Sequence, residues 1–335
     1  MKIGIFEIEK WEKNYLKKSL LANHELYFFK QELNNKTVTS LNIKDLDIIS
    51  TFIYSKIDKP VIDYLSSLKM ISTRSTGFDH IDTDYAAQKN ISVSNVPYYG
   101  ENTVAEHTFA LILSLSRNLH KAYTQTLSGR FSIKELQGFD LKGKTLGVIG
   151  AGKIGLHVIK MAKGFDMKVL VYDINRDNFL SEILDFTYTD MENLLKKSDI
   201  ITIHTPYNKH THHIINMNNI KLFKRGSILI NTARGGCVET EAIIYGLENN
   251  ILAGAGLDAF EGEDLLKEDQ ALLYHDLSRE KLETILQNNI LLKNEKVVIT
   301  PHIAFNSREA VMRILDTSVK NIIGFIEGKP QNRVN

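Results

Sequence analysis

The sequence predicts an α/β fold built from two doubly wound parallel-sheet domains with a cleft between them, and three observations lead to this prediction. Short apolar runs alternate with helical patterns almost throughout the chain, which is typical of parallel sheets. The length of 335 residues fits two domains better than one. A glycine-rich turn follows an apolar run in the middle of the chain. The turn belongs to the second half of the chain, so the two halves are expected to differ.

The first region, residues 1–98, has five short apolar runs separated by helical patterns. The predicted strands are residues 3–8, 25–29, 48–51, 70–72 and 91–94. No glycine fingerprint follows the first of them, so this region is not expected to hold a dinucleotide. Pro97 then interrupts the pattern, and Asn102 is a predicted N-cap of a long helix over 103–123. That helix is apolar on more than one face, which indicates a domain seam or a subunit interface on its second side.

The second region, residues 99–300, has a longer succession of apolar runs. The predicted strands are residues 145–149, 168–172, 200–204, 227–231, 254–257 and 297–300. Segment 263–295 is polar with a helical pattern, so we expect it on the surface. A final helix over 307–328 has apolar residues at helical spacing. We expect it to return to the first domain, which would then comprise residues 1–98 and 301–335.

The strongest motif joins a strand, a glycine turn, a helix, a second strand and a terminal acid. The turn reads Gly150-Ala151-Gly152-Lys153-Ile154-Gly155. Gly150 permits the tight turn, Gly152 lets a pyrophosphate approach the backbone, and Gly155 lets the helix pack on the strand. Asp173 ends the second strand, where its carboxylate can accept hydrogen bonds from ribose hydroxyls and would repel a 2′-phosphate. The motif therefore predicts a Rossmann domain that binds NAD rather than NADP.

Composition argues against several classes of partner. The chain has 41 basic and 40 acidic residues, so no net field favours nucleic acid or a membrane surface. No apolar run approaches the ~20 residues of a membrane span, and the N-terminus does not resemble a signal peptide. The single cysteine, Cys237, suits a reducing cytoplasm and is interpreted as a small buried hydrophobe. The histidines 204, 210, 212 and 213 lack a carboxylate at metal-ligand spacing, so no metal is expected.

Three polar segments follow predicted strands of the second region, where open α/β sheets bind ligands. They carry Arg234, Glu263 and His302. Hydride transfer between a nicotinamide and a 2-keto acid needs a cation for the substrate carboxylate, which Arg234 can supply. It also needs a proton donor for the developing alkoxide, which suits His302, and an acid behind the imidazole, which suits Glu263. Each residue taken alone could equally have a structural role.

These motifs together resemble the D-isomer-specific 2-hydroxyacid dehydrogenases, and within that family the D-lactate dehydrogenases. The resemblance covers nearly the whole chain. It rests on Ser75-Thr76-Gly77-Phe78-Asp79-His80-Ile81-Asp82, Val96-Pro97-Tyr98-Tyr99, Val104-Ala105-Glu106-His107, the glycine fingerprint and the three polar segments. The loop Gly100-Glu101-Asn102-Thr103 departs from the serine-proline pair that many relatives have in this hinge loop.

The resemblance implies a flavodoxin-like substrate domain, a Rossmann NAD-binding domain and a set of site residues. Arg234, Glu263 and His302 fall on the family's catalytic residues. The implied substrate contacts are Thr76, Gly77, Tyr99, Tyr54 and Phe305, of which Tyr54 and Tyr99 could equally be core aromatics. The implied cofactor contacts are Gly150, Gly152, Lys153, Ile154, Gly155, Asp173, His204, Thr205, Pro206, Thr232, Ala233, Arg234, Asp258 and His302. Glu261 lies two residues before Glu263 and could be confused with it, whereas His107 is interpreted as structural.

The expected reaction is reduction of pyruvate to D-lactate with NADH, because Tyr54, Tyr99 and Phe305 together would exclude a long side chain. A different small 2-keto acid, such as glyoxylate, hydroxypyruvate or a bulkier relative, stays open. A non-catalytic NAD sensor of the corepressor type also stays open, although the complete catalytic set argues against it. The apolar helix over 103–123 and the resemblance both predict a homodimer.

Overall fold

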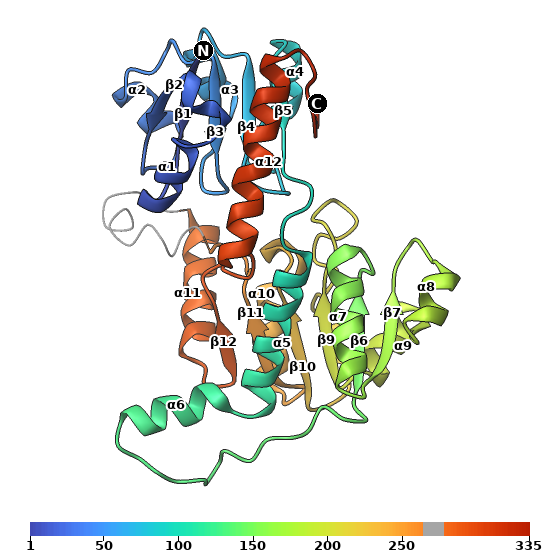
Figure 1. Ribbon diagram of the computed structural model, residues 1–335. Coiled ribbons are helices and arrows are strands. Elements are labelled where there is room, and N and C mark those ends of the chain that lie inside the picture. Colours follow the sequence, from blue (N-terminus) through green and yellow to red (C-terminus); the bar gives the residue numbers. More distant parts are fainter. Residues whose placement is uncertain (264–277) are drawn as a thin grey trace. The chain divides into compact units, whose positions relative to one another are not determined.

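The computed structural model describes residues 1–263 and 278–335, and its residue contacts divide the chain into two compact units. The first unit comprises Met1–Gly100 and Ser307–Asn335, and the second comprises Glu101–Asn306. The chain therefore crosses between the units twice, a few residues beyond the crossings expected from the sequence. Each unit has its own parallel sheet, as the predicted fold class requires (Figure 1).

The first unit is built on a five-stranded sheet. Its strands are β1 (Lys2–Ile5), β2 (Glu25–Phe28), β3 (Ile48–Thr51), β4 (Met70–Thr73) and β5 (Ser92–Ser94), in the order β2-β1-β3-β4-β5 with every pair parallel. This order is the flavodoxin-like arrangement. The first strand ends three residues earlier than expected, because Glu7 has a left-handed backbone with φ 52° and cannot continue it.

Helices cover both faces of this sheet. The helices are α1 (Lys10–Leu16), α2 (Asn35–Ser40), α3 (Lys59–Tyr64), α4 (Thr83–Gln88) and α12 (Arg308–Ile326), with a 3-10 helix at Leu20–Asn23. Val38, Ile62 and Ala86 from α2, α3 and α4 pack in one core with Ile49 and Ile71 of the sheet. Helix α12 contacts β4 and α1 within the same unit. The final helix thus packs with the first sheet, and Ser307 caps it by accepting a hydrogen bond from the Ala310 amide.

The second unit is built on a seven-stranded sheet. Its strands are β6 (Thr145–Ile149), β7 (Lys168–Tyr172), β8 (Thr187–Tyr188), β9 (Ile200–Ile203), β10 (Ser227–Asn231), β11 (Leu252–Leu257) and β12 (Val297–Ile299). The order β12-β11-β10-β9-β6-β7-β8 is entirely parallel and reverses at β6, as in a Rossmann sheet. Strand β8 was not predicted, since two residues are too short to show a period.

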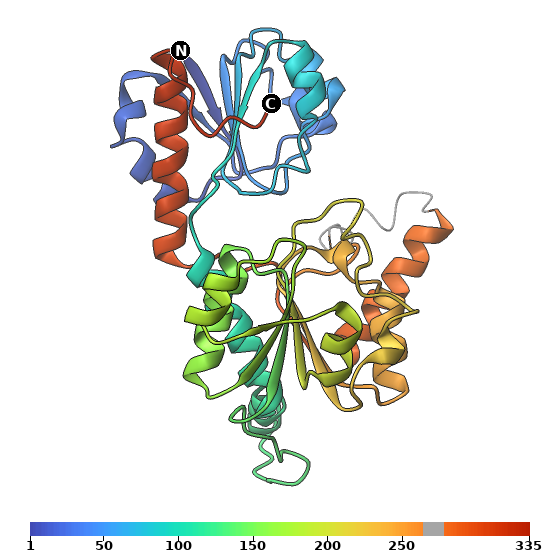
Figure 2. The ribbon, with the colours of Figure 1, turned by 90° about the vertical axis from the view of Figure 1, so that its right-hand side faces the viewer.

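Two hydrophobic cores cover the two faces of this sheet. Helices α5 (Glu101–Ser116) and α7 (Lys153–Gly164) contribute to one core, and α9 (Met191–Lys197), α10 (Thr240–Glu248) and α11 (Arg279–Lys293) contribute to the other (Figure 2). The remaining helices are α6 (Leu119–Leu127), α8 (Asn178–Ile183) and the 3-10 helices Ile220–Leu222 and Gly235–Cys237. Helix α11 bears out the helical pattern expected within 263–295, while residues 264–277 of that segment lie outside the described residues.

The predicted long helix over 103–123 differs from the structure in three ways. It begins at Glu101, so Asn102 lies inside the helix and does not cap it. It breaks at Asn118, whose φ of 51° is left-handed and tolerated by asparagine, and α6 follows as a separate helix. Its second apolar side packs against α7 of the same unit, so burial of α5 does not by itself require another domain or subunit.

Candidate active site

His302 and Glu263 form a hydrogen-bonded pair at the carboxyl end of β12. The imidazole Nδ1 of His302 lies 2.7 Å from Oε1 of Glu263, and both side chains are largely buried. His302 has a left-handed backbone with φ 55°, and its amide donates to the Asp258 carbonyl at 3.1 Å. With Nδ1 held by a carboxylate, Nε2 is the nitrogen available for proton exchange with a ligand.

The neighbouring carboxylate Glu261 has a different environment. Its Oε1 lies 2.6 Å from Nε2 of His213, and its Oε2 accepts the Thr240 amide at 2.9 Å. Glu261 thus joins the start of α10 to the turn that follows β11. Of the two glutamates, it is Glu263 whose carboxylate contacts His302.

Asp258, at the end of β11, anchors the turn that carries His302. Its carboxylate accepts the amides of Ile303 and Ala304, both at 2.8 Å, and the Thr300 hydroxyl at 2.5 Å. The Nε2 atom of His107, on α5, lies 3.4 Å from the same carboxylate. Burial raises the pKa of Asp258, but these donors outweigh the desolvation, so its net pKa lies below the ordinary value. Asp258 is therefore an ionised anchor for the His302 turn.

Arg234 lies beyond the end of β10, the strand next to β11. Its Nη1 donates to the Ala233 carbonyl at 2.9 Å. The fully buried Asn231 organises this loop, because its amide nitrogen donates to the carbonyls of Arg234 and Ala259, both at 2.9 Å. Arg234, Asp258 and His302 consequently follow three adjacent parallel strands at one edge of the sheet.

The glycine turn between β6 and α7 has the shape that a dinucleotide pyrophosphate requires. Gly150 has φ 95°, and a Cβ on Gly155 would lie 2.1 Å from the Gly150 carbonyl oxygen. A Cβ on Gly152, the N-cap of α7, would meet nothing within 4 Å, so the backbone is open there to a ligand. Lys153 and Ile154 open α7, whose amide groups and dipole favour a phosphate.

Asp173 directly follows β7 and lies next to the glycine turn. Its Oδ2 accepts the Ala151 amide at 2.7 Å, and its Oδ1 accepts the Asn175 amide at 2.8 Å. The carboxylate thus lies directly beside the glycine turn, where a ribose hydroxyl could reach it. The residues present fit NAD.

His204, Thr205 and Pro206 follow β9, and His204 and Thr205 lie next to Gly150 of the glycine turn. A Cβ on Gly150 would come within 2.9 Å of the His204 backbone. Nε2 of His204 lies 2.9 Å from the Thr202 hydroxyl, and its buried Nδ1 has no partner among the described residues. Burial lowers the pKa of His204 to about 3, so this imidazole is neutral at physiological pH. The Thr205 hydroxyl lies 4.0 Å from the buried Cys237 sulfur.

Four of the predicted substrate contacts belong to the first unit, whereas Phe305 belongs to the second. The Thr76 hydroxyl donates to the Val96 carbonyl at 2.8 Å, and the Ser75 hydroxyl donates to the Gly77 carbonyl at 2.6 Å. The Tyr99 carbonyl accepts a hydrogen bond from Arg313 of α12 at 2.5 Å. Tyr54 is 44% exposed, so its side chain is not part of the core of that unit.

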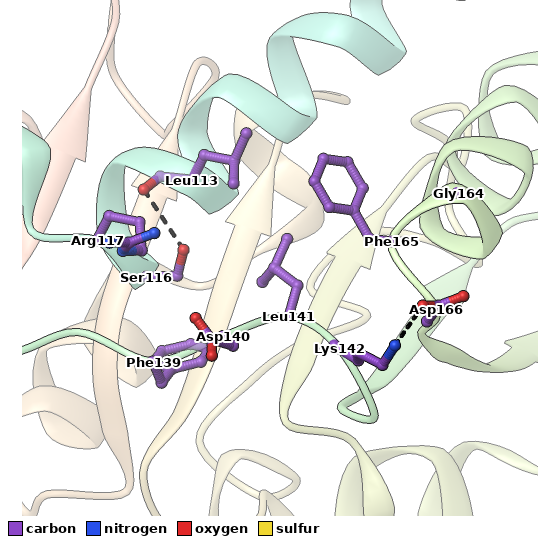
Figure 3. Close-up of a pocket in the computed structure, with 10 residues that line it drawn as sticks. All are labelled: Leu113, Ser116, Arg117, Phe139, Asp140, Leu141, Lys142, Gly164, Phe165 and Asp166. Carbon is purple, nitrogen blue, oxygen red and sulfur yellow. Dashed lines mark hydrogen bonds and ion pairs between the residues drawn. The ribbon is translucent and has the colours of Figure 1, made fainter.

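A pocket of about 420 Å³ lies elsewhere in the second unit (Figure 3). It is lined by the end of α5, residues 139–142 and the C-terminal turn of α7, including Leu113, Phe139 and Phe165. Residues 139–142 lead into the start of β6, so this pocket lies at the edge where strands begin. The candidate catalytic residues lie at the opposite edge, where strands end.

Sequence reasoning missed two parts of this site. Asn231 is a buried amide that directly follows the apolar run of β10, a position that could have marked it. His107 was interpreted as structural, yet its Nε2 lies 3.0 Å from the Thr300 hydroxyl in the network around Asp258. Nothing in the sequence connects those residues, since the contact spans 193 positions.

Two further features concern the described residues only. No group of three or more histidine, cysteine, aspartate or glutamate side chains within 1–263 and 278–335 is arranged to hold a metal ion. None of the helices in that part of the chain combines the length and the apolarity that a membrane span needs.

Comparison with known proteins gives one family. Residues 109–304 match the model of the D-isomer specific 2-hydroxyacid dehydrogenase NAD binding domain. The chain is 31% identical to the D-lactate dehydrogenase of Escherichia coli, covering 98% of both chains. It is 37% identical to the glyoxylate reductase of Thermofilum pendens, covering 86% of this chain and 80% of that one.

A solved structure of the D-lactate dehydrogenase from Aquifex aeolicus, complexed with NAD and lactic acid, is also similar. It has 35% identity and a TM-score of 0.85, and the match covers 98% of this chain and 96% of that chain. The likeness confirms the two-sheet fold and the NAD cofactor predicted from the sequence. The chain therefore belongs to the D-isomer specific 2-hydroxyacid dehydrogenase family and is an NAD-dependent oxidoreductase of 2-hydroxy and 2-keto acids.

Proposed function

We propose that this protein is a D-lactate dehydrogenase that reduces pyruvate to D-lactate with NADH. The observation that carries the proposal is the His302–Glu263 pair, with its 2.7 Å contact, at the same edge of the parallel sheet as Arg234 and the glycine turn after β6. A proton donor, an orienting carboxylate and a cation are the groups that carbonyl reduction requires. The E. coli and A. aeolicus relatives named above are D-lactate dehydrogenases, which supports pyruvate as the substrate.

Each residue has a defined task in this proposal. Arg234 binds the substrate carboxylate as a two-pronged donor and polarises the adjacent carbonyl. Nε2 of His302 donates a proton to the carbonyl oxygen as negative charge develops there, while Glu263 holds Nδ1 and fixes the orientation of the ring. Backbone amides of Thr76 and Gly77 bind the substrate carboxylate, and Tyr54, Tyr99 and Phe305 contact the rest of the substrate. The turn of Gly150, Gly152 and Gly155 and the Asp173 carboxylate hold NADH, which supplies the hydride when bound.

A second small 2-keto acid is favoured by one specific observation. The relative from T. pendens is a glyoxylate reductase, and its identity to this chain is higher than that of the E. coli D-lactate dehydrogenase. Glyoxylate lacks the methyl group of pyruvate, and a missing methyl group in an apolar pocket costs only about 1–3 kcal/mol of discrimination. An assay therefore has to compare pyruvate and glyoxylate directly.

The deciding experiment measures NADH oxidation, followed by loss of its absorbance, with pyruvate, glyoxylate, hydroxypyruvate, 2-ketoisocaproate and phenylpyruvate. NADPH is tested in parallel, and the chirality of the product is determined by chromatography on a chiral phase. The highest kcat/KM with pyruvate, together with D-lactate as the product, would support the proposal. The highest kcat/KM with glyoxylate would replace it with a glyoxylate reductase, and binding of NADH without any turnover would indicate a sensor.

We also propose a homodimer, for which the second unit offers an exposed apolar arm, defined as α6 and residues 128–133. Leu119, Tyr123 and Leu127 repeat every four residues on α6 and are exposed, and Phe131 and Ile133 are 86% and 90% exposed. Figure 1 shows α6 and the segment after it extending away from the sheet of their unit. Monomeric proteins seldom leave such a stripe in water.

The dimer is tested by light scattering after size-exclusion chromatography. Tyr123→Glu with Leu127→Glu should convert a dimer into a monomer, because two charges would have to be buried in the interface. Leu20→Glu, at a residue 68% exposed in the first unit, is the matched control and should leave the mass unchanged. A wild-type protein of monomer mass at micromolar concentration would defeat this proposal.

A further inference from the structure

Glu7 directs its carboxylate at the loop that follows β3, residues 52–55, which we call the aromatic loop because it contains Phe52 and Tyr54. Oε2 of Glu7 accepts the Phe52 amide at 2.7 Å and the Ser55 hydroxyl, and Oε1 accepts the Tyr54 amide at 2.8 Å. One carboxylate therefore takes three donors from four consecutive residues. Ser55 is itself fixed, since its hydroxyl oxygen also accepts the Leu33 amide at 2.9 Å.

The backbone of Glu7 shows that this arrangement has a cost. Its φ of 52° lies in the left-handed region, which is unfavourable for a residue with a side chain. Glycine would adopt the same φ without that cost. Hydrogen bonds to a charged acceptor are stronger than those between neutral groups, so the three contacts of the carboxylate can offset the strain.

Arg74 contacts the backbone of Glu7. Its side chain is 3% exposed, and its Nη2 donates to the carbonyls of Phe6 at 2.6 Å and Glu7 at 2.9 Å. Burial lowers the pKa of Arg74, while the negative charges of Glu12 and Glu7 oppose that shift. Arg74 directly precedes the segment that carries Thr76 and Gly77. A single network thus connects Glu7 to two of the three predicted substrate-binding segments of the first unit, the one with Tyr54 and the one with Thr76 and Gly77.

All these segments lie at the ligand-binding edge of the five-stranded sheet. Glu7 follows β1, the aromatic loop follows β3 and Arg74 follows β4, and these three strands are adjacent and parallel. Ligands of open α/β sheets bind beyond the carboxyl ends of the strands. The rings of Phe52 and Tyr54 lie 6.1 Å apart at an interplanar angle of 84°, so they form one edge-to-face pair.

We propose that Glu7 is a positioning residue for substrate selectivity. Its carboxylate fixes the backbone of the aromatic loop, so that Phe52 and Tyr54 present a fixed aromatic wall to the side chain of the 2-keto acid. This inference deepens the proposed function and rests on it, because it takes the aromatic loop as a substrate contact. A fixed wall admits the methyl group of pyruvate and rejects a branched chain such as that of 2-ketoisocaproate.

Two variants separate the carboxylate from the backbone strain. Glu7→Gln keeps the size of the side chain but replaces one carboxylate oxygen, which accepts hydrogen bonds, with an NH2 group. That group would then face a backbone N–H, which is also a donor. Glu7→Gly removes the carboxylate and fits the left-handed backbone, so it should fold without strain. Glu25→Gln is the matched control, because Glu25 lies exposed on β2, where its carboxylate accepts the Tyr27 hydroxyl at 3.0 Å.

The first measurement is hydrogen–deuterium exchange of the NAD-free protein, followed by mass spectrometry of peptides that contain residues 52–55. The second is the ratio of kcat/KM for pyruvate to that for 2-ketoisocaproate, and the third is NADH affinity from fluorescence titration. We expect faster exchange of the aromatic loop in Glu7→Gln and Glu7→Gly, and a selectivity ratio that falls about tenfold, as loss of one charge-assisted hydrogen bond would give. NADH affinity and the Glu25→Gln control should match the wild type.

Three results would overturn the inference. Unchanged exchange of the aromatic loop in both variants would show that Glu7 does not position it. An equal loss of kcat/KM for pyruvate and 2-ketoisocaproate would indicate a general structural role rather than selectivity. Faster exchange of the aromatic loop with unchanged kcat/KM values would show that the loop does not discriminate between the two substrates. If the wild type reduces no 2-keto acid, the proposed function fails together with the selectivity role, and exchange alone then decides whether Glu7 positions the loop.

Discussion

Nδ1 of His302 lies 2.7 Å from Oε1 of Glu263, although 39 residues separate them in the chain. The contact forms because Glu263 follows β11 and His302 follows β12, and these strands are adjacent and parallel. Parallel strands end at the same edge of a sheet, so side chains far apart in sequence meet there.

Replacing His302 with Gln should lower kcat by about 10²–10⁴-fold, the usual contribution of a general acid. The dissociation constant of NADH, measured by fluorescence titration, should change little, because the glycine turn and Asp173 are untouched. Glu263→Gln should cause a smaller loss of kcat. Glu261→Gln is the control, since its carboxylate contacts His213 and Thr240 instead of His302. Equal losses of kcat and NADH affinity in His302→Gln would contradict the proposed role of His302 as the acid.

Asp173→Ala should reduce the preference for NADH over NADPH. In the proposed site, the carboxylate beside the Ala151 amide would repel a 2′-phosphate and accept ribose hydroxyls, so its removal should weaken NADH binding and relieve the repulsion. The measurement is kcat/KM for both cofactors with a saturating 2-keto acid. Asp166→Asn is a suitable control at the opposite end of α7, because asparagine also tolerates the left-handed φ of 54° found there. Unaltered NADH affinity in Asp173→Ala would refute the ribose contact.

Gly155→Ala and Gly164→Ala should have opposite effects although both residues lie in α7. A Cβ at 155 would lie 2.1 Å from the Gly150 carbonyl oxygen, so the helix must move away from the turn, at a cost of about 1–3 kcal/mol or more. A Cβ at 164 would meet nothing within 4 Å, and alanine there should stabilise the helix by about 0.5–1 kcal/mol. Thermal unfolding and NADH titration of both variants check this. Equal melting temperatures would contradict the close contact at Gly155.

Asp258→Asn should destabilise the protein at neutral pH by about 1.5–3 kcal/mol, because the amides of Ile303 and Ala304 lose a charged acceptor. The pKa of Asp258 is lowered in the folded state, so the unfolded state binds more protons as the pH falls. The stabilisation is therefore fully present above the unfolded pKa of about 3.9 and is lost as the pH falls through the lower folded pKa.

Urea unfolding of both proteins from pH 7 to pH 3 tests this dependence. The difference in unfolding free energy between the wild type and Asp258→Asn should shrink towards the acid end. The exposed Asp84→Asn serves as a control with little expected effect. A difference that stays constant or grows as the pH falls would show that Asp258 is not the ionised anchor of the His302 turn.

Much of the fold could be predicted from the sequence because its signals are local. The strand of 145–149, the glycine turn and the strand of 168–172 follow one another within 30 residues or so, and each depends on neighbours in the chain. The same holds for α12, whose cap and apolar spacing are visible in the sequence. The predicted helix over 103–123 failed at Asn118, where a tertiary hydrogen bond to the Gln137 carbonyl accompanies the left-handed break.

The sequence by itself determined the two parallel-sheet domains, the NAD fingerprint and the residue types at the strand ends. Only the tertiary structure decided that Glu263 rather than Glu261 contacts His302, that Asn231 organises the Arg234 loop, and that Glu7 holds the aromatic loop. The reason is physical. Periodicity and turn chemistry act over a few residues, whereas the partner of a carboxylate 39 or 45 positions away depends on strand order and on the path of each loop.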